Sequence, residues 1–282
     1  MRNISMKRLI LISLSLSFVL SHYASAQIVG DDYQIEQQLL ASTKQLNQFF
    51  RRFNGEEDTK GNKFEPNDRQ YRNDRLRKRY ISILFDEENA GISSQTKKDF
   101  LDQVTKEGSP LYLNLHSPNW FAVVNTTFMH EGREQPLTLY MQIQEEGLGY
   151  EWVIADISFE PYKNIFKKQR GETKEFLHPM SHELDFMNLR KALLKGGSPE
   201  SYTLADYKPD LMTLFLYEVK KGTLEFKTVN TMKFHFFGVE GWYFSLANFN
   251  RASDNSGWLI SDLLQINASQ KEDILKIIYD KQ

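Results

Sequence analysis

Hydrophobic residues recur every three to four positions in several stretches of the chain, which is the spacing of amphipathic helices. In the first half this pattern covers residues 35–53, 76–84 and 95–106, and the third stretch begins after Ser94, a good helix cap, and stops at Gly108. The second half carries the same pattern over residues 184–194, 211–220 and 271–279. We therefore predict helices over these ranges, of which the last has no counterpart in the first half.

Strand-like segments follow the helical segments in each half. They are rich in β-branched and aromatic residues and are separated by glycine-containing turns. Their ranges are 121–130, 135–144 and 151–159 in the first half, and 223–237, 242–249 and 258–266 in the second. Consecutive strands joined by short turns predict an antiparallel meander in each half.

Short segments of the first half recur in the same order in the second half. Residues 124–130 read VNTTFMH and residues 229–235 read VNTMKFH, so that four of seven positions are identical. Residues 152–157 read WVIADI, and residues 258–263 read WLISDL. The shared order and the similar spacing predict a tandem duplication.

Helices that pack on one face of a curved antiparallel sheet give an α+β architecture, predicted here as two tandem domains over residues 27–160 and 161–282. The order of the elements and the tryptophan in each final strand, Trp152 and Trp258, resemble the NTF2-like (cystatin-like) superfamily of cone-shaped α+β folds. The resemblance implies either an enzyme, such as an isomerase or a dehydratase with an Asp/His pair in the cone, or a non-catalytic binding or oligomerising module. The fold alone does not choose between them.

Residues 1–26 have the layout of a cleavable secretory signal. Three basic residues precede an apolar run over residues 9–20, and a small-x-small cleavage site ends at Ala26. An uncleaved membrane anchor is the alternative, but the run is shorter than the ~20 apolar residues that a span requires, and no later stretch approaches that length. We therefore predict an exported chain that begins at Gln27 and is located in the periplasm or outside the cell.

Composition narrows the class of protein. The 282 residues include no cysteine, carry a formal net charge of −2 and are 40% hydrophobic. Near-neutral charge argues against a protein that coats nucleic acid, and the lack of cysteine excludes disulfides and thiol chemistry. An exported chain without cysteine is typical of a bacterial cell envelope. Motifs of serine hydrolases, nucleotide-binding loops and zinc proteases are absent, so no cofactor is expected.

Two histidines end equivalent predicted strands, and two aspartates lie on equivalent final strands. His130 with Asp156, and His235 with Asp262, would each place a carboxylate beside an imidazole and provide a general base near neutral pH. The alternative interpretation is structural, with each histidine beside a turn and each aspartate bonded to a turn or a backbone amide. Residues kept in both copies of a duplication are often those that the fold requires, which favours the structural interpretation.

His178 and His182 have the spacing of two metal ligands on one helical face, and Glu183 follows them. Pro179 lies between the two histidines, and Glu183 is not where the helix of a zinc protease requires its glutamate. We therefore predict no metal site, and we expect His182 to begin the helix over residues 184–194.

Two hypotheses for function remain. The preferred one is a non-catalytic exported module that binds an envelope protein, a glycan or a small apolar ligand, without nucleic acid as a partner and with dimer formation left open. Its candidate contact residues are two aromatic and two basic side chains, Trp242, Tyr243, Arg72 and Arg79. The basic pair belongs to a run of mixed charge, which is usually a solvated helix face. The alternative is a small-molecule isomerase, dehydratase or hydrolase that uses a His/Asp pair.

Overall fold

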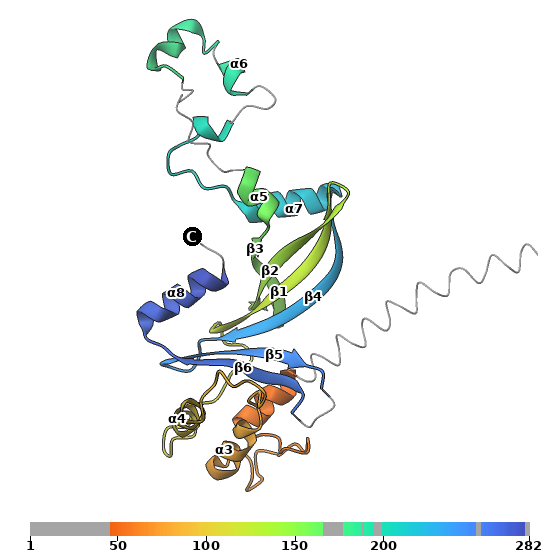
Figure 1. Cartoon of the computed structure of the whole chain (residues 1–282), viewed down its shortest axis with the longest axis vertical. Coiled ribbons are helices and arrows are strands. Elements are labelled where there is room, and N and C mark those ends of the chain that lie inside the picture. The colour runs from red at the N-terminus through yellow and green to blue at the C-terminus, as the bar shows by residue number, and fades with distance from the viewer. Residues whose placement is uncertain (1–45, 166–176, 188, 194–198, 252–254, 280–282) are drawn as a thin grey trace, which may run out of the picture. The chain divides into compact units, whose positions relative to one another are not determined.

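The computed structural model describes residues 46–165, 177–187, 189–193, 199–251 and 255–279 (Figure 1). The predicted signal sequence and the first part of the helix predicted over residues 35–53 lie outside these ranges. Among the described residues, no helix combines the length and the apolarity that spanning a bilayer requires.

The second half of each predicted domain contributes to one antiparallel sheet of six strands, in the order β3-β2-β1-β4-β5-β6 (Figure 1). The strands are β1 (Trp120–His130), β2 (Arg133–Glu146), β3 (Gly149–Ser158), β4 (Leu224–Phe236), β5 (Trp242–Phe249) and β6 (Gly257–Gln265). Each of them lies within two residues of its predicted range. The alternating pattern and the glycine turns therefore identified all six strands, and the prediction of an α+β fold is confirmed.

The two meanders meet at their first strands, β1 and β4, which pair antiparallel. The repeated Asn and Thr residues lie at this junction. Asn125 Nδ2 donates a hydrogen bond to Thr231 Oγ1 at 2.9 Å, and Asn230 Nδ2 donates one to Thr127 Oγ1 at 2.9 Å. These side chains bond across the junction, so the recurring motif has a structural role.

The helices are mostly where the pattern predicts them. They are α3 (Asp74–Ser82), α4 (Ser94–Val104), α5 (Glu160–Ile165), α6 (Leu189–Ala192), α7 (Leu211–Lys221) and α8 (Ala268–Ile278), with two 3-10 helices, η1 (Pro179–Leu184) and η2 (Pro199–Tyr202). Residues 46–54 are also helical. The cap of α4 is Ser93 rather than Ser94, because the Ser93 hydroxyl accepts the Thr96 N–H at 3.0 Å.

The helix predicted over residues 184–194 is wrong. In its place η1 comes first and α6 follows. Asp185 and Phe186 separate the two with φ angles of 49° and 53°, the left-handed region that an α-helix of L-residues does not enter. His182 therefore lies inside η1 instead of starting a helix.

By packing, the chain divides into two compact units. The first comprises the described residues up to Glu88 with those of Leu101–Leu113 and Phe249–Leu259, and the second comprises those of Asn89–Phe100, Asn114–Asn248 and Ile260–Gln282. This division is based on contacts between residues. The domain boundary predicted at residue 160 is based on the repeated sequence segments, and it stays a prediction.

The first unit is built around a buried arginine. Arg77 of α3 is 0% exposed, and its guanidinium donates hydrogen bonds to the carbonyls of Phe53 at 2.7 Å, Val104 at 2.8 Å and Leu111. The ring of Tyr112 covers it at 4.5 Å. Burial lowers the pKa of Arg77 to about 10, which still leaves it charged at neutral pH. Because its partners are backbone carbonyls and rings from several segments, Arg77 stabilises the packing of this unit. Its guanidinium is not available to bind a ligand.

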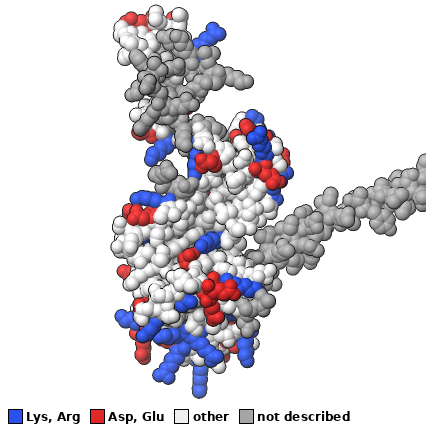
Figure 2. Space-filling model, viewed as in Figure 1, with Lys and Arg blue, Asp and Glu red and all other residues white. Residues whose placement is uncertain are grey.

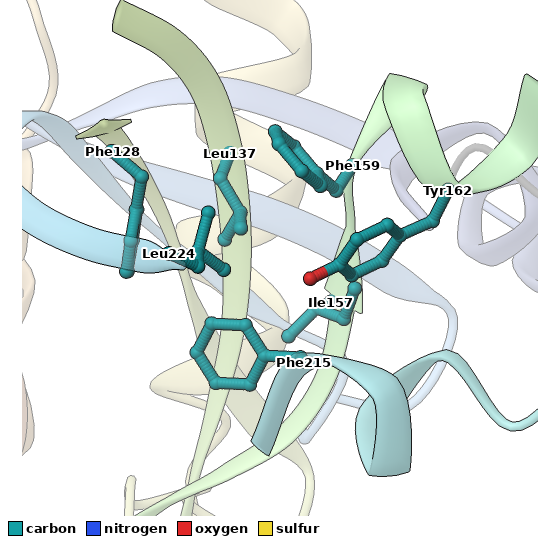
Figure 3. Close-up of a cluster of buried hydrophobic side chains, with 7 residues drawn as sticks. All are labelled: Phe128, Leu137, Ile157, Phe159, Tyr162, Phe215 and Leu224. Carbon is teal, nitrogen blue, oxygen red and sulfur yellow. The ribbon is translucent and has the colours of Figure 1, made fainter. Parts of the chain in front are cut away.

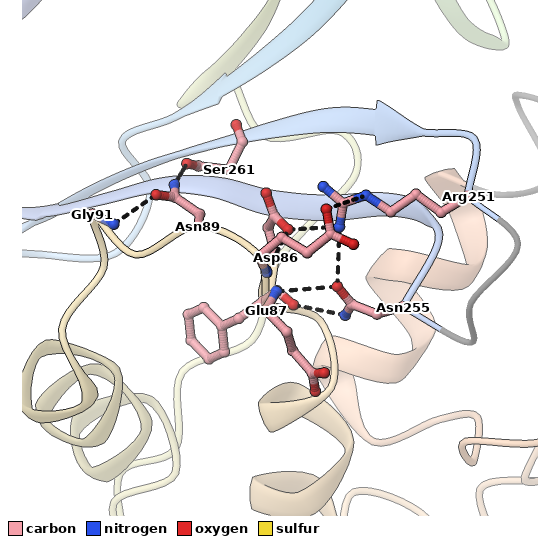
Figure 4. Close-up of polar contacts among 9 residues, drawn as sticks. Asp86, Glu87, Asn89, Gly91, Arg251, Asn255 and Ser261 are labelled. Carbon is pink, nitrogen blue, oxygen red and sulfur yellow. Dashed lines mark hydrogen bonds and ion pairs between the residues drawn. The ribbon is translucent and has the colours of Figure 1, made fainter.

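A second set of polar contacts in this unit fixes the two ends of the connection between β5 and β6 (Figure 4). Arg251 Nη1 lies 2.7 Å from the Asp86 carboxylate. Asn255 accepts the Glu87 N–H at 3.0 Å and donates to the Phe85 carbonyl at 2.9 Å. These bonds hold Arg251 and Asn255 against the turn that follows α3.

The core of the second unit contains seven buried side chains from β1 to β4, α5, α7 and the single residue between β3 and α5 (Figure 3). They are Phe128, Leu137, Ile157, Phe159, Tyr162, Phe215 and Leu224. Phe215 of α7 packs edge-on against Phe128 of β1, with 5.9 Å between ring centroids. This cluster fixes α7 on one side of the sheet.

Candidate functional site

A groove of about 510 Å³ lies between α8 and the sheet in the second unit. Its apolar lining includes Phe121 of β1, Phe237 just after β4, and Leu275 and Tyr279 on and beside α8. The Phe121 ring centroid lies 5.2 Å from that of Tyr279 and 6.2 Å from that of Phe237. Small-molecule sites typically enclose about 300–1,000 Å³ and are largely apolar, so this groove has the size and lining of such a site.

The helix that forms one wall of the groove is secured at both ends. At the start of α8, Asn267 and Gln270 form a capping box, in which each side chain accepts the other residue's backbone N–H at 2.9 Å. At its end, Tyr140 of β2 donates a hydrogen bond to the Ile278 carbonyl at 2.9 Å. The Tyr140 ring also stacks on Tyr279, with 4.4 Å between centroids. The wall is therefore preformed.

Polar side chains complete the lining of the groove: Asn119, Gln142, Lys271, Glu272 and Lys276. Lys271 is half-buried, and its Nζ lies 5.5 Å from the centroid of the Phe237 ring, within the range of a cation–π interaction. Lys276 is exposed and lies 3.6 Å from the Asp273 carboxylate. An apolar floor with a few polar groups can hold a ligand and also orient it.

His235 lies beside Phe121 on the same face of the sheet, because the two residues pair across β1 and β4, but it does not line the groove. Its ring stacks on Phe121 at 5.4 Å, its Nδ1 lies 2.9 Å from Tyr243 Oη, and it is 7% exposed. Burial, together with the nearby Lys233 charge, lowers the pKa of His235 to about 4. Burial also raises the pKa of Tyr243. At neutral pH the contact is therefore between an uncharged imidazole and an uncharged phenol, which suits a structural role.

Asp262, the predicted partner of His235, is bound by other groups. Lys233 Nζ lies 2.6 Å from its carboxylate, and the hydroxyls of Ser245 and Ser261 donate hydrogen bonds to it. Burial opposes its ionisation, but the hydrogen bonds from Lys233 and Ser245 outweigh this effect and lower the pKa of Asp262. Among the described residues, no hydrogen bond joins His235 to Asp262.

The other predicted histidine, His130, lies beside a carboxylate that sequence reasoning missed. Its Nε2 is 3.3 Å from Glu218 Oε2 of α7, and Tyr162 Oη donates a hydrogen bond to the same oxygen at 2.8 Å. The His130 ring packs edge-on against Phe159. Burial, and then the hydrogen bond to Glu218, raise the pKa of Tyr162. No sequence motif links Glu218 to His130, because only the docking of α7 brings them together.

Asp156, the predicted partner of His130, accepts a hydrogen bond from the Ile157 N–H at 2.8 Å. Ile157 belongs to the same buried cluster as Phe159, against which His130 packs. Successive side chains of a strand point to opposite faces of a sheet, so Asp156 points away from this cluster. The structure therefore places Glu218, and not Asp156, beside His130.

The two aromatic residues proposed to contact a partner are buried. Trp242 is 2% exposed and packs edge-on against Phe100 at 5.3 Å, and Tyr243 is 6% exposed. The aromatic residue of this region that reaches the groove is Phe237, which is half-buried. Its position where β4 ends, before Gly238, is the only sequence signal that separates it from its buried neighbours.

The two basic residues proposed to contact a partner differ from each other. Arg72 Nη2 lies 2.6 Å from Glu56, and its guanidinium lies 4.5 Å from the Tyr112 ring centroid, so intramolecular contacts occupy it. Arg79 is exposed on α3, where Lys and Arg side chains gather (Figure 2). Arg79 is not one of the residues that line the groove.

The two histidines with metal-ligand spacing serve the backbone instead. His178 Nδ1 accepts the Met180 N–H at 3.1 Å as the cap of η1, and His182 Nδ1 lies 2.9 Å from the Pro179 carbonyl. Within the described part of the chain, no group of three or more His, Asp or Glu side chains is placed to hold a metal ion.

Comparisons with known proteins found no relative. No protein-family model matches the chain, and neither the curated proteins nor the solved structures gave a match. The class of protein is therefore defined by the fold and the groove: an α+β protein with a six-stranded antiparallel sheet and a small-molecule-sized groove under its last helix.

Proposed function

We propose that this protein is an exported, non-catalytic binding module of the bacterial cell envelope, and that it holds a small ligand with an apolar face in the groove under α8. The observation that carries this proposal is the lining of the groove, in which Phe121, Phe237 and Tyr279 surround a preformed space. The basic and apolar segments of residues 1–26 support export.

The duplication and the NTF2-like resemblance belong to the same proposal. Two three-stranded meanders joined at their first strands are what a tandem duplication would produce, and the reciprocal Asn-Thr hydrogen bonds across β1 and β4 are consistent with it. In this view α8 is the element that one copy gained. It creates the groove on a sheet that is otherwise repeated.

The test of the proposed function is to fill the groove and measure binding of a neutral apolar dye, N-phenyl-1-naphthylamine, by its fluorescence. Leu275→Trp adds a large side chain at the middle of the α8 wall, and we expect it to weaken dye binding at least tenfold. Ile277→Trp is the matched control, because Ile277 lies on the same helix, is 77% exposed and does not line the groove. Dye binding that is absent, or equal in both variants and the unmodified protein, would contradict the proposal.

Export has its own test. Expressed with its full sequence in a Gram-negative bacterium, the protein should be recovered from the periplasm or the medium with Gln27 as its first residue, as shown by intact-mass measurement. Leu16→Arg interrupts the apolar run of residues 9–20 and should retain the precursor in the cytoplasm. Cytoplasmic recovery of the unmodified chain would contradict the envelope assignment.

A second candidate function, small-molecule catalysis, is favoured by the contact between His130 and Glu218 at 3.3 Å. A carboxylate beside an imidazole can orient it for proton transfer. Against this, the side chains of His130 and Glu218 are only 11% and 19% exposed and do not line the groove. Diethyl pyrocarbonate labelling separates the cases: a catalytic His130 would react as fast as the exposed His182, whereas a structural one would react far more slowly.

A further inference from the structure

The half-buried Lys271 places a positive charge at one end of the groove. Within the described residues it makes no ion pair, and its Nζ lies over the face of the Phe237 ring, 5.5 Å from the centroid. Two other lysines of the same unit have carboxylates beside them: Lys233 lies 2.6 Å from Asp262, and Lys276 lies 3.6 Å from Asp273. Lys271 is therefore a cation held at the groove with a ring as its neighbour, and a ligand anion can supply its missing counter-charge.

The α8 wall of the groove has a polar end and an apolar end. Lys271, Leu275 and Tyr279 follow one another at intervals of four residues, so they form one stripe along the helix. Eight residues of helix extend about 12 Å, which spans roughly two fused rings and a head group. A ligand lying along this stripe would meet an ammonium group at one end and apolar surface over the rest of its length.

Neighbouring side chains limit the charge that the ligand carries. Glu272 lines the groove beside the stripe, and the lining residue Lys276 is already paired with Asp273. One negative charge on the ligand neutralises Lys271, and Glu272 would repel a second one. The side-chain amides of Asn119 and Gln142 make no hydrogen bonds among the described residues and can donate to the same head group.

We propose that the groove binds a soluble, monoanionic aromatic acid, with its carboxylate or sulfonate at Lys271 and its rings between Phe237, Leu275 and Tyr279. This inference rests on the proposed function and names the class of ligand that the same site takes. A ligand with a flat apolar body satisfies the ring surfaces, and a single acidic head satisfies Lys271.

The test compares two dyes that share the N-phenylnaphthylamine framework. One is the sulfonate 8-anilinonaphthalene-1-sulfonate, and the other is neutral N-phenyl-1-naphthylamine. The sulfonate should bind the mature protein about fivefold more tightly, as expected for a partly exposed ion pair, and the advantage should shrink as salt is added. Lys271→Gln should remove this advantage, so that the variant binds the two dyes with similar affinity.

Lys221→Gln on α7 is the matched control. Lys221 also lies over an aromatic ring, that of Tyr217 at 5.7 Å, but it does not line the groove. Its removal should change the binding of neither dye. Circular dichroism of each variant confirms that the fold is intact before the titration.

The outcomes separate the two proposals. If both dyes bind equally, or if Lys271→Gln leaves the preference for the sulfonate unchanged, the inference about an acidic ligand is overturned while a groove blocked by Leu275→Trp still stands. If neither dye binds, or if Leu275→Trp affects neither, the proposed function itself fails. A preference for the sulfonate that Lys271→Gln abolishes supports both.

Discussion

The two histidines that end the repeated segments have very different surroundings. His130 lies beside the carboxylate of Glu218 on α7, at the edge of a packed core. His235 is buried and uncharged, and its ring stacks on that of Phe121, which lines the groove. The two imidazoles thus have different neighbours: Glu218 of α7 lies beside His130, whereas Phe121 of β1 and Tyr243 of β5 lie beside His235. The recurring Asn125 and Asn230 bond across the junction of β1 and β4, whereas the groove proposed to bind a ligand has α8 as one wall.

The largest expected effect contrasts the core under α7 with the groove under α8. Phe128→Ala removes a ring that is 4% exposed and should reduce the free energy of unfolding by about 3–5 kcal/mol. Leu275→Ala removes a half-buried side chain that lines a groove and should cost about 1 kcal/mol. Urea unfolding of both variants measures the difference. Similar losses would mean that the space under α8 is ordinary core.

The second effect concerns the pH dependence that His235 imposes. Above pH 6.5, the ordinary pKa of histidine, the His235 imidazole is uncharged in both the folded and the unfolded chain. Between pH 6.5 and about 4 it binds a proton in the unfolded chain but not in the folded chain. The free energy of unfolding should therefore fall as the pH falls through this window, by up to about 3 kcal/mol. The lowered pKa of Asp262 acts in the same direction only below its ordinary value of 3.8.

Urea unfolding at pH 7 and at pH 4.5 measures this slope. His235→Gln should reduce it strongly, whereas His116→Gln, at an exposed position, should leave it in place. An unchanged slope in His235→Gln would show that the folded protein does not hold this imidazole uncharged.

The smallest effect concerns the residues that the two halves share. Asn230→Ala removes the exposed hydrogen bonding with Thr127, and Asn125→Ala removes exposed hydrogen bonds with Thr231 of β4 and Thr138 of β2. Each substitution should cost roughly 0.5–1 kcal/mol. Neither should change binding of the neutral dye. Thermal unfolding and dye titration of the two variants check this, and a loss of binding without a loss of stability would show that the repeated amides have a functional role.

The sheet was predictable from the sequence because its signals are local. Alternating apolar residues and glycine turns, such as Glu131-Gly132, determine where each strand begins and ends, whatever packs on it. The helix predicted over residues 184–194 failed for the opposite reason, since its apolar spacing is helical while Asp185 and Phe186 adopt left-handed backbone angles.

The candidate site was less predictable because its members come together only through packing. Phe121 and Phe237 resemble their buried neighbours in sequence, and Glu218 reaches His130 from a distant helix. One usable signal was present: Lys271, Leu275 and Tyr279 form a stripe on a helix that the first half lacks. A stripe of a cation and apolar residues at four-residue intervals is typical of helices that line a binding site and also of helices that pack on a core. The sequence alone therefore does not distinguish the two.

The most direct test of ligand binding in the groove is chemical-shift mapping of ¹⁵N-labelled residues 27–282, titrated with 8-anilinonaphthalene-1-sulfonate. We expect the largest shifts at backbone amides of the groove lining, including those of Asn119, Phe121, Phe237 and Lys271, and no change at amides around His130 and Glu218. Shifts centred on His130 and Glu218 would contradict it, because the ligand would then bind in the core under α7 and not in the groove under α8.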